Sequence, residues 1–169
     1  YLRCGMSDIS RSETDRLENY VVAVGLRGYK KWQAVWARKT NRTDEEELAV
    51  LNGLRVRFVE MTESLVFVLK QRKKTVRDIC EAVYHFFVEN QIQEKLKVME
   101  NCFAEKKELA LAKEYAQIYR IVLELFDKFA ELLGDEGISL KEYCELLDVG
   151  LEEAKVGVIP PGMDQVVIG

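Results

Sequence analysis

The stretch from Glu108 to Leu133 constrains the fold most strongly. It contains neither proline nor glycine, so nothing in its sequence interrupts a helix. One apolar row recurs along it at helical spacing: Ala112, Tyr115, Tyr119, Val122, Phe126, Phe129 and Leu133. A second row repeats every seven residues: Leu111, Ile118, Leu125 and Leu132. Two apolar rows are typical of a helix packed on most of its circumference, so we expect the central helix of an all-α domain.

Capping patterns predict the other helices. Ser10 with Glu13 and Ser139 with Glu142 have the spacing of capping boxes, and Thr75 is a third candidate cap. The predicted helices cover residues 10–24, 43–69, 75–87, 92–103 and 139–147, with a short helix within 31–38 and a hairpin turn at 104–107. We therefore expect a bundle of about five to six helices with a short C-terminal extended or β tail.

The chain of 169 residues is expected to hold one helical domain, residues 1–157, and an extended tail, residues 158–169. Gly150 and Gly157 are expected to flank a loop, and the tail combines a proline turn with a strand-like run, QVVI. A lone strand leaves backbone groups unpaired, and the chain begins at Tyr1 instead of methionine. These observations lead us to expect a segment of a larger polypeptide.

Several classes of protein are disfavoured by composition. The four cysteines are far apart, and no two have the spacing of a shared zinc or iron ligand pair. Three of them, Cys80, Cys102 and Cys144, fall on predicted helices, where we expect buried thiols in a reducing cytoplasm. No apolar run approaches the ~20 residues of a membrane helix, and no signal peptide is visible. We predict no membrane association.

Catalytic residues are not predicted. His85 is the only histidine, and it lies beside aromatic residues that are typical of a core. No glycine-rich loop followed by Lys-Ser or Lys-Thr is present, so that route to nucleotide binding is absent. The acids at 44–47 suit the positive end of a helix dipole better than a metal site. We expect neither a metal ligand nor a cofactor in this segment.

Charge is distributed unevenly along the chain. Residues 1–77 carry 16 lysines and arginines against 10 acids, whereas residues 78–169 carry 9 against 19. Cations release counterions from nucleic-acid phosphates, and aromatic rings stack on exposed bases. We predict a DNA surface formed by Arg27, Lys30, Lys31, Trp32, Trp36, Arg38, Lys39 and Arg42, with a second choice formed by Lys70, Arg72, Lys73, Lys74 and Arg77. The alternative is that the tryptophans are core anchors and the cations form a solvated face. The acidic half could also face a basic partner domain.

Three stretches resemble the B subunit of the bacterial ATP-dependent helicase–nuclease that resects double-strand breaks, the AddB type. The first lies within residues 9–32 and includes DRLENYV and GLRGYKKW. The second is LGDEGISLKE at 133–142, and the third is IPPGMDQVVIG at 159–169. Residues 43–130 match only in helical character. None of the three motifs is catalytic.

The resemblance implies a much longer subunit with a helicase-like front part and a nuclease back part. The resemblance implies that the front part is similar to UvrD-like helicases but has lost ATP motor function, and that it serves DNA binding and recognition of a recombination hotspot sequence. The nuclease part carries metal-binding acids, with magnesium, and a cysteine-ligated iron–sulfur cluster. This chain matches neither the nuclease motif nor the cluster. It corresponds to a helical insertion in the second motor-like lobe, with residues 165–169 re-entering that lobe. The implied partners are DNA and the A subunit of the helicase–nuclease, which is the partner motor subunit, with a purely protein-binding module as the alternative.

Overall fold

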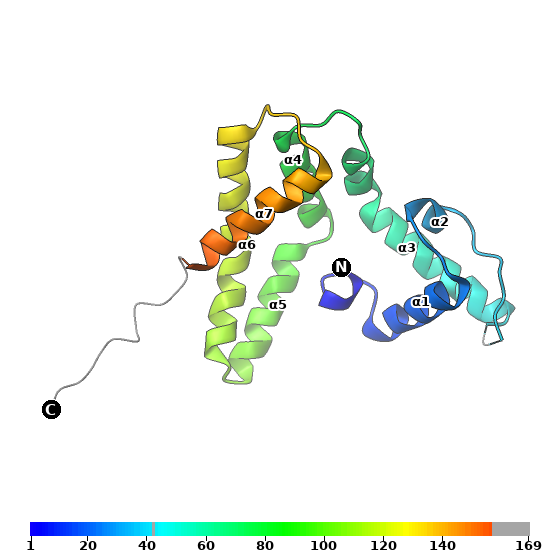
Figure 1. The fold of residues 1–169 in the computed structure, drawn as a ribbon. Coiled ribbons are helices and arrows are strands. Elements are labelled where there is room, and N and C mark those ends of the chain that lie inside the picture. Colours follow the sequence, from blue (N-terminus) through cyan, green and yellow to red (C-terminus); the bar gives the residue numbers. More distant parts are fainter. Residues whose placement is uncertain (42, 157–169) are drawn as a thin grey trace.

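The computed structural model describes residues 1–41 and 43–156, and this part of the chain is all-α, as predicted (Figure 1). The elements are the 3-10 helix η1 (Leu2–Cys4) and the α-helices α1 (Arg11–Val24), α2 (Tyr29–Gln33), α3 (Glu45–Leu69), α4 (Val76–Glu89), α5 (Ile92–Glu105), α6 (Leu109–Leu133) and α7 (Leu140–Val156). The described residues form no β-strand and only one isolated antiparallel bridge, between Thr75 and Gly137. The predicted strand at 165–168 lies outside the described residues.

Local capping hydrogen bonds explain where several helices begin. The Ser10 hydroxyl accepts from the Glu13 amide and the Glu13 carboxylate accepts from the Ser10 amide, which confirms the predicted capping box of α1. Equivalent pairs form at Thr75 with Asp78 and at Ser139 with Glu142. The residue that caps α3 is Asp44, one residue after the predicted start at Thr43, because its carboxylate accepts from the Glu47 amide.

The helices form two groups, each with its own hydrophobic core (Figure 1). Helices α1, α2 and α3 enclose the first core, which consists of Ile9, Leu17, Tyr20, Trp36, Leu51 and Leu54. Helices α4, α6 and α7 enclose the second, which consists of Val76, Ile79, Cys80, Leu125, Phe126, Phe129 and Tyr143. The long helix α3 leads from the first group to the second, where its end packs on α4.

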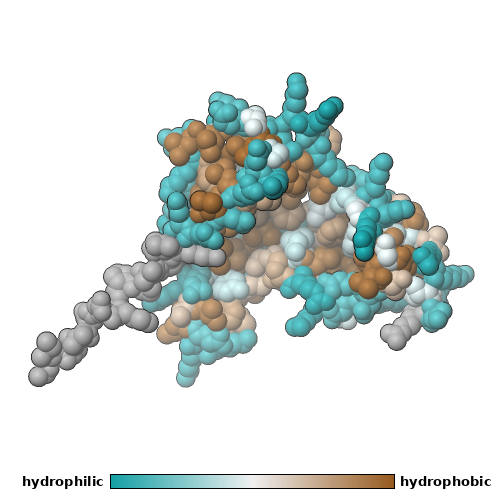
Figure 2. Space-filling model, viewed as in Figure 1, coloured by the Kyte–Doolittle hydropathy of each residue, from teal (hydrophilic) through white to brown (hydrophobic). Residues whose placement is uncertain are grey.

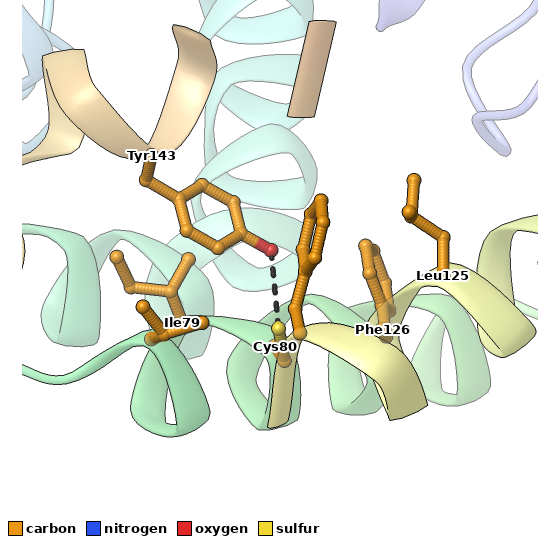
Figure 3. Packing of buried hydrophobic residues seen from close by; sticks show 7 residues of the cluster. Ile79, Cys80, Leu125, Phe126 and Tyr143 are labelled. Carbon is orange, nitrogen blue, oxygen red and sulfur yellow. Dashed lines mark hydrogen bonds between the residues drawn. The ribbon is translucent and has the colours of Figure 1, made fainter. Parts of the chain in front are cut away.

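The second core contains one buried thiol (Figure 3). Tyr143 reaches from α7 toward Cys80 on α4, and its hydroxyl lies 3.4 Å from the sulfur. Burial raises the pKa of Cys80, so the thiol remains protonated in this apolar setting. The prediction of buried thiols is wrong for the other two helical cysteines, because Cys102 and Cys144 are exposed.

Helix α7 extends beyond the predicted end at Leu147 and includes Gly150, which was expected to flank a loop. A Cβ atom at Gly150 would lie 2.7 Å from Cδ1 of Leu125 and 2.8 Å from Cζ of Phe129. The glycine therefore permits α7 to approach α6 closely, and it acts here as a packing residue. A helix breaker and a contact glycine look the same in sequence.

Helix α6 packs against α4, α5 and α7, as predicted for the central helix, but its second apolar row is only partly covered. Leu125 is buried beneath Gly150, but Leu111, Ile118 and Leu132 are 38%, 39% and 77% exposed. Figure 2 shows further apolar surface in the hollow between the two helical groups, with hydrophilic side chains over much of the rim.

None of the helices in the described ranges has the length and apolar character required to cross a membrane.

Candidate nucleic-acid interface

Helix α2 is attached to the C-terminal half of α3 through Tyr29. The Tyr29 hydroxyl lies 3.3 Å from the carbonyl oxygen of Val59 and 3.3 Å from the hydroxyl of Thr62. The ammonium group of Lys70, at the end of α3, lies 4.5 Å from the centre of the Tyr29 ring. This cation–π contact brings the two predicted basic stretches together.

The segment that follows α2 is held against the middle of α3 by two polar side chains. Arg55 donates to the carbonyl oxygen of Trp32 at 2.7 Å. Asn52 pairs with both backbone groups of Trp36, accepting from its amide and donating to its carbonyl oxygen, each at 2.9 Å. These side-chain hydrogen bonds satisfy backbone groups that would otherwise lack the partners that a sheet or a helix provides.

The same segment is bonded to α1 at Arg38 and reaches the beginning of α3 through Lys39. The hydroxyl of Tyr20, on α1, donates to the carbonyl oxygen of Arg38 at 2.6 Å. Burial raises the pKa of Tyr20, which keeps this hydroxyl protonated as a donor. The ammonium group of Lys39 lies 2.7 Å from the carboxylate of Glu45, the first residue of α3.

Residues 29–39 therefore run antiparallel along α3, from Val59 and Thr62 back to Glu45. We use the name cationic strip for the basic residues that lie on this path or at its end: Lys70, Lys30, Lys31, Arg38 and Lys39. The positions of α3 that the path contacts, from Thr62 to Glu45, are separated by a rise of about 26 Å at 1.5 Å per residue. The uneven charge of the sequence thus becomes a linear arrangement in the structure.

The charges of the strip are largely uncompensated within the chain. Lys30, Lys31 and Arg38 are exposed, and none of the described acids forms an ion pair with them. Three cations of the first group that lie outside the strip are paired instead, namely Arg3 with Glu18, Arg16 with Glu47 and Arg57 with Glu13. The strip can accept anionic groups from outside without first breaking an internal ion pair, except at Lys39.

Both tryptophans of the predicted DNA surface belong to the first core. Trp36 is 5% exposed, its ring stacks on Tyr20 at a centroid distance of 5.1 Å, and its indole donates to the carbonyl oxygen of Lys31. Trp32 is half-buried and packs against Trp36 and Phe58, with ring centroids 5.2 and 4.5 Å away. The structure therefore contradicts base stacking by Trp36, because neither face of its ring is free.

Four of the second-choice cations, Lys70, Arg72, Lys73 and Lys74, lie at the turn between α3 and α4, whereas Arg77 lies in the first turn of α4. These four line an open cleft whose opposite side is formed by Asp135 and residues 137–140, before and at the start of α7. Arg72 and Lys73 are exposed, whereas the ammonium group of Lys74 donates to the Gln71 carbonyl oxygen. Arg77 donates to the carbonyl oxygen of Ala130 and is thereby engaged at the end of α6.

Two candidates of the first predicted surface remain. Arg27 is exposed before α2, and residue 42 lies outside the described ranges.

Asn52 and Arg55 are the two site residues that the sequence analysis missed. They lie beside Leu51 and Leu54 on α3, and Arg55 is only 7% exposed. A buried arginine on an otherwise apolar helix face is rare unless its donors have partners. The interruption of the apolar face at these positions was the available clue.

The structure provides no evidence for catalytic chemistry in the described part of the chain. No group of three or more His, Cys, Asp or Glu side chains there could hold a metal ion. His85 is exposed on α4, where its ring lies beside that of Tyr84. What the site offers is a set of exposed positive charges on a backbone path that is bonded to α1 and α3.

Comparison with known proteins relates the chain to helicase–nuclease subunits, although no family model matches it. It is 40% identical, over its whole length, to a protein of Lachnoclostridium phytofermentans named as the B subunit of an ATP-dependent helicase/deoxyribonuclease, of which it covers 15%. Proteins of the same name from Clostridium novyi and Caldanaerobacter subterraneus are 38% and 33% identical over 99% of the chain, which covers 14% and 15% of them. The predicted similarity to the AddB-type subunit is confirmed, and the chain spans about 15% of the length of these relatives.

Proposed function

We propose that this chain, which is similar over its whole length to a segment of the B subunit of a helicase/deoxyribonuclease, is a non-catalytic helical module whose cationic strip contacts DNA. The observation that carries the proposal is the alignment of Lys30, Lys31, Arg38, Lys39 and Lys70 along one side of α3. Exposed lysine and arginine side chains release counterions from phosphates, which is the main source of sequence-independent affinity for DNA.

The module would act within a larger subunit. We propose that residues 1–157 form an insertion in a helicase-like lobe and that residues 158–169 lead back into that lobe. The larger protein would act with the partner motor subunit in double-strand break repair by recombination. Its ATP, magnesium and iron–sulfur chemistry would then belong to regions outside this chain.

Fluorescence anisotropy with labelled DNA tests the proposal. At about 50 mM salt, where phosphate contacts are strongest, the chain should bind DNA with an affinity that falls steeply as salt rises. Lys30→Ala/Lys31→Ala should weaken binding and reduce the steepness of the salt dependence. The exchange removes side chains only, so the Lys31 carbonyl oxygen still accepts from Trp36.

Lys113→Ala/Lys128→Ala is the matched control, because it removes two exposed cations from α6, away from the strip. Both double variants lose the same net charge, so a general charge effect would weaken binding equally. Equal loss in the two variants, or absence of binding at 50 mM salt, would contradict the proposed DNA contact.

A second candidate function is contact with the partner motor subunit alone. The α5–α6 hairpin favours it, since Val98 and Leu109 are 67% and 62% exposed and Leu111 and Ile118 are partly exposed. Apolar residues gathered on one projecting element are typical of protein-binding surfaces. In that case Leu111→Ser/Ile118→Ser should reduce co-purification with the partner motor subunit, while DNA binding by the isolated chain should be absent.

A further inference from the structure

We propose that the open cleft between the α3–α4 turn and the start of α7 binds an acidic peptide segment of a protein partner, with an apolar side chain of that segment on the floor of the cleft. The turn and the start of α7 lie at the same end of the molecule (Figure 1). This site is separate from the proposed DNA contact, because it depends on Arg72 and Lys73, which are not part of the cationic strip.

One wall of the cleft is cationic. Lys70, Arg72, Lys73 and Lys74 line it. Arg72 and Lys73 are exposed, and no acid in the described part of the chain forms an ion pair with either of them. Both can therefore form charge-assisted hydrogen bonds with carboxylates from outside the chain.

The acids that border the cleft do not cancel this charge. Only Asp78 and Asp135 lie among the described residues of its lining, so the four cations leave a net charge of +2. The carboxylate of Asp78 accepts from the Thr75 amide at 2.8 Å, and that of Asp135 lies 3.7 Å from Nε of Arg77. Each acid thus has its own partner, and neither is paired with the cationic wall.

The floor of the cleft is apolar. Leu69 and Ile138 are half-buried and pack against the second core, and Leu140, at the start of α7, is 42% exposed. A DNA backbone has no apolar group to cover these side chains, and none of the described residues that line the cleft offers an aromatic ring for a base to stack on. An apolar peptide side chain that covers them leaves water, which is favourable. The floor therefore favours a peptide over a nucleic acid.

The cleft is preformed, because main-chain contacts join its two sides. Thr75 and Gly137 form the antiparallel bridge, and the amide of Ile138 donates to the carbonyl oxygen of Lys74 at 3.1 Å. Binding therefore does not have to order the site first. The volume of the cleft, about 770 Å³, suits a few side chains of a peptide segment and not an interface between folded domains.

Fluorescence anisotropy with the full 169-residue chain and a fluorescein-labelled peptide, Asp-Asp-Asp-Leu-Phe, tests the ligand class. We expect this peptide to bind with a Kd below about 0.1 mM at ~100 mM salt. One control peptide has asparagine in place of each aspartate, and the other has serine in place of leucine and phenylalanine. Each should bind at least about tenfold more weakly, because it lacks either the charges or the apolar side chains. Absence of binding by the first peptide, or equal binding by either control, would overturn the proposal.

Arg72→Ala/Lys73→Ala should weaken binding of the first peptide by at least about tenfold. Both side chains are exposed, so the circular dichroism spectrum should stay unchanged. Lys30→Ala/Lys31→Ala removes the same charge from the strip and should leave the peptide affinity unaltered. Equal weakening by the two double variants would overturn the site.

The apolar floor is tested separately. Leu140→Ser should weaken binding of the first peptide, whereas Leu132→Ser, at a position that is 77% exposed on α6 and outside the cleft, should not. If both variants bind the peptide as the wild type does, the floor makes no contact and the proposal fails.

Labelled DNA distinguishes the two classes of ligand. Arg72→Ala/Lys73→Ala should weaken DNA binding no more than the control Lys113→Ala/Lys128→Ala. If the cleft variant instead loses as much affinity for DNA as for the peptide, its cations belong to a nucleic-acid surface and the peptide site is overturned. A chain that binds the peptide but no DNA would contradict the proposed function and leave the peptide site standing.

Discussion

The ammonium nitrogen of Lys70 lies 4.5 Å from the centre of the Tyr29 ring, which joins the end of α3 to the first residue of α2. The contact connects positions that are remote in sequence and orients one cation of the strip. It also means that Lys70 has a structural partner, in contrast to Lys73, which is exposed in the following turn.

Lys70→Ala should lower the free energy of unfolding by about 0.5–1 kcal/mol, the usual value of an exposed cation–π contact. Lys73→Ala should leave the free energy of unfolding nearly unchanged. Urea denaturation followed by circular dichroism measures both. If the two variants are equally stable, the Lys70 contact with Tyr29 contributes nothing in solution.

Asn52→Ala should release the segment after α2 from α3. It leaves the amide and carbonyl groups of Trp36 without their partner, which should cost about 1–3 kcal/mol of stability. Asn101→Ala, at an exposed position on α5, is the control and should cost far less. The test compares the denaturation midpoints of the two variants and the salt dependence of their DNA binding, which should become less steep only for Asn52→Ala.

Two glycines inside helices should respond in opposite directions to alanine. Gly150→Ala places a methyl group against Leu125 and Phe129 and should destabilise the chain by about 1–3 kcal/mol. Gly53→Ala, on α3, meets no atom within 4 Å and should stabilise it by about 0.5–1 kcal/mol, the difference in helix propensity. Thermal or chemical denaturation of both variants checks the pair. A neutral Gly150→Ala would show that α7 lies farther from α6 than described.

The capping carboxylates predict a loss of stability in acid. Hydrogen bonds from Ser139 lower the pKa of Glu142 from its ordinary value of 4.5, and hydrogen bonds from Ser10 lower that of Glu13. A group with a lowered folded-state pKa contributes fully above its unfolded pKa and loses that contribution as pH falls through the folded pKa. The free energy of unfolding should therefore decline below about pH 4.5. Glu142→Gln should flatten this decline, whereas Glu131→Gln, which is at no helix cap, should not. An identical pH profile for wild type and Glu142→Gln would contradict the capping role.

Thiol titration should separate Cys80 from the other three cysteines. Cys4, Cys102 and Cys144 are exposed, so a disulfide reagent should modify them in the native protein. Cys80 is 4% exposed, and burial raises the pKa of its thiol, so it should react only on unfolding. The reaction of Cys80 should therefore be the slow phase of the thiol titration. Cys80→Ala should remove that phase and leave the reaction of the other three thiols unchanged. Rapid reaction of all four thiols would mean that the second core opens readily.

Helix caps could be predicted because they depend on groups three residues apart. Ser10 with Glu13 and Ser139 with Glu142 form the expected pairs, and the predicted turn at 104–107 separates α5 from α6. The exposure of the second apolar row of α6 could not be predicted. It depends on where α7 crosses α6, and that crossing is set by Gly150, which looks like a helix breaker in sequence.

The candidate site could likewise be predicted only in part from the sequence. Its cations were predicted from charge alone, because exposed lysines and arginines are evident in sequence. Their alignment was not, since it depends on Asn52 and Arg55, which reach the segment after α2 through tertiary hydrogen bonds. Aromatic rings between cations suggested base stacking, but the sequence does not reveal that Trp36 faces the core.

The antiparallel path of residues 29–39 along α3 has a consequence for the order of folding. Its contacts join residues 6, 16, 23 and 30 positions apart: Lys39 with Glu45, Trp36 with Asn52, Trp32 with Arg55, and Tyr29 with Val59. Each successive contact enlarges an already closed loop by seven to ten residues, and the entropic cost of closure grows only slowly with length. The segment can thus zip onto α3 from the turn at residue 40 outward, and a break near that turn should undo more of it than a break at its far end.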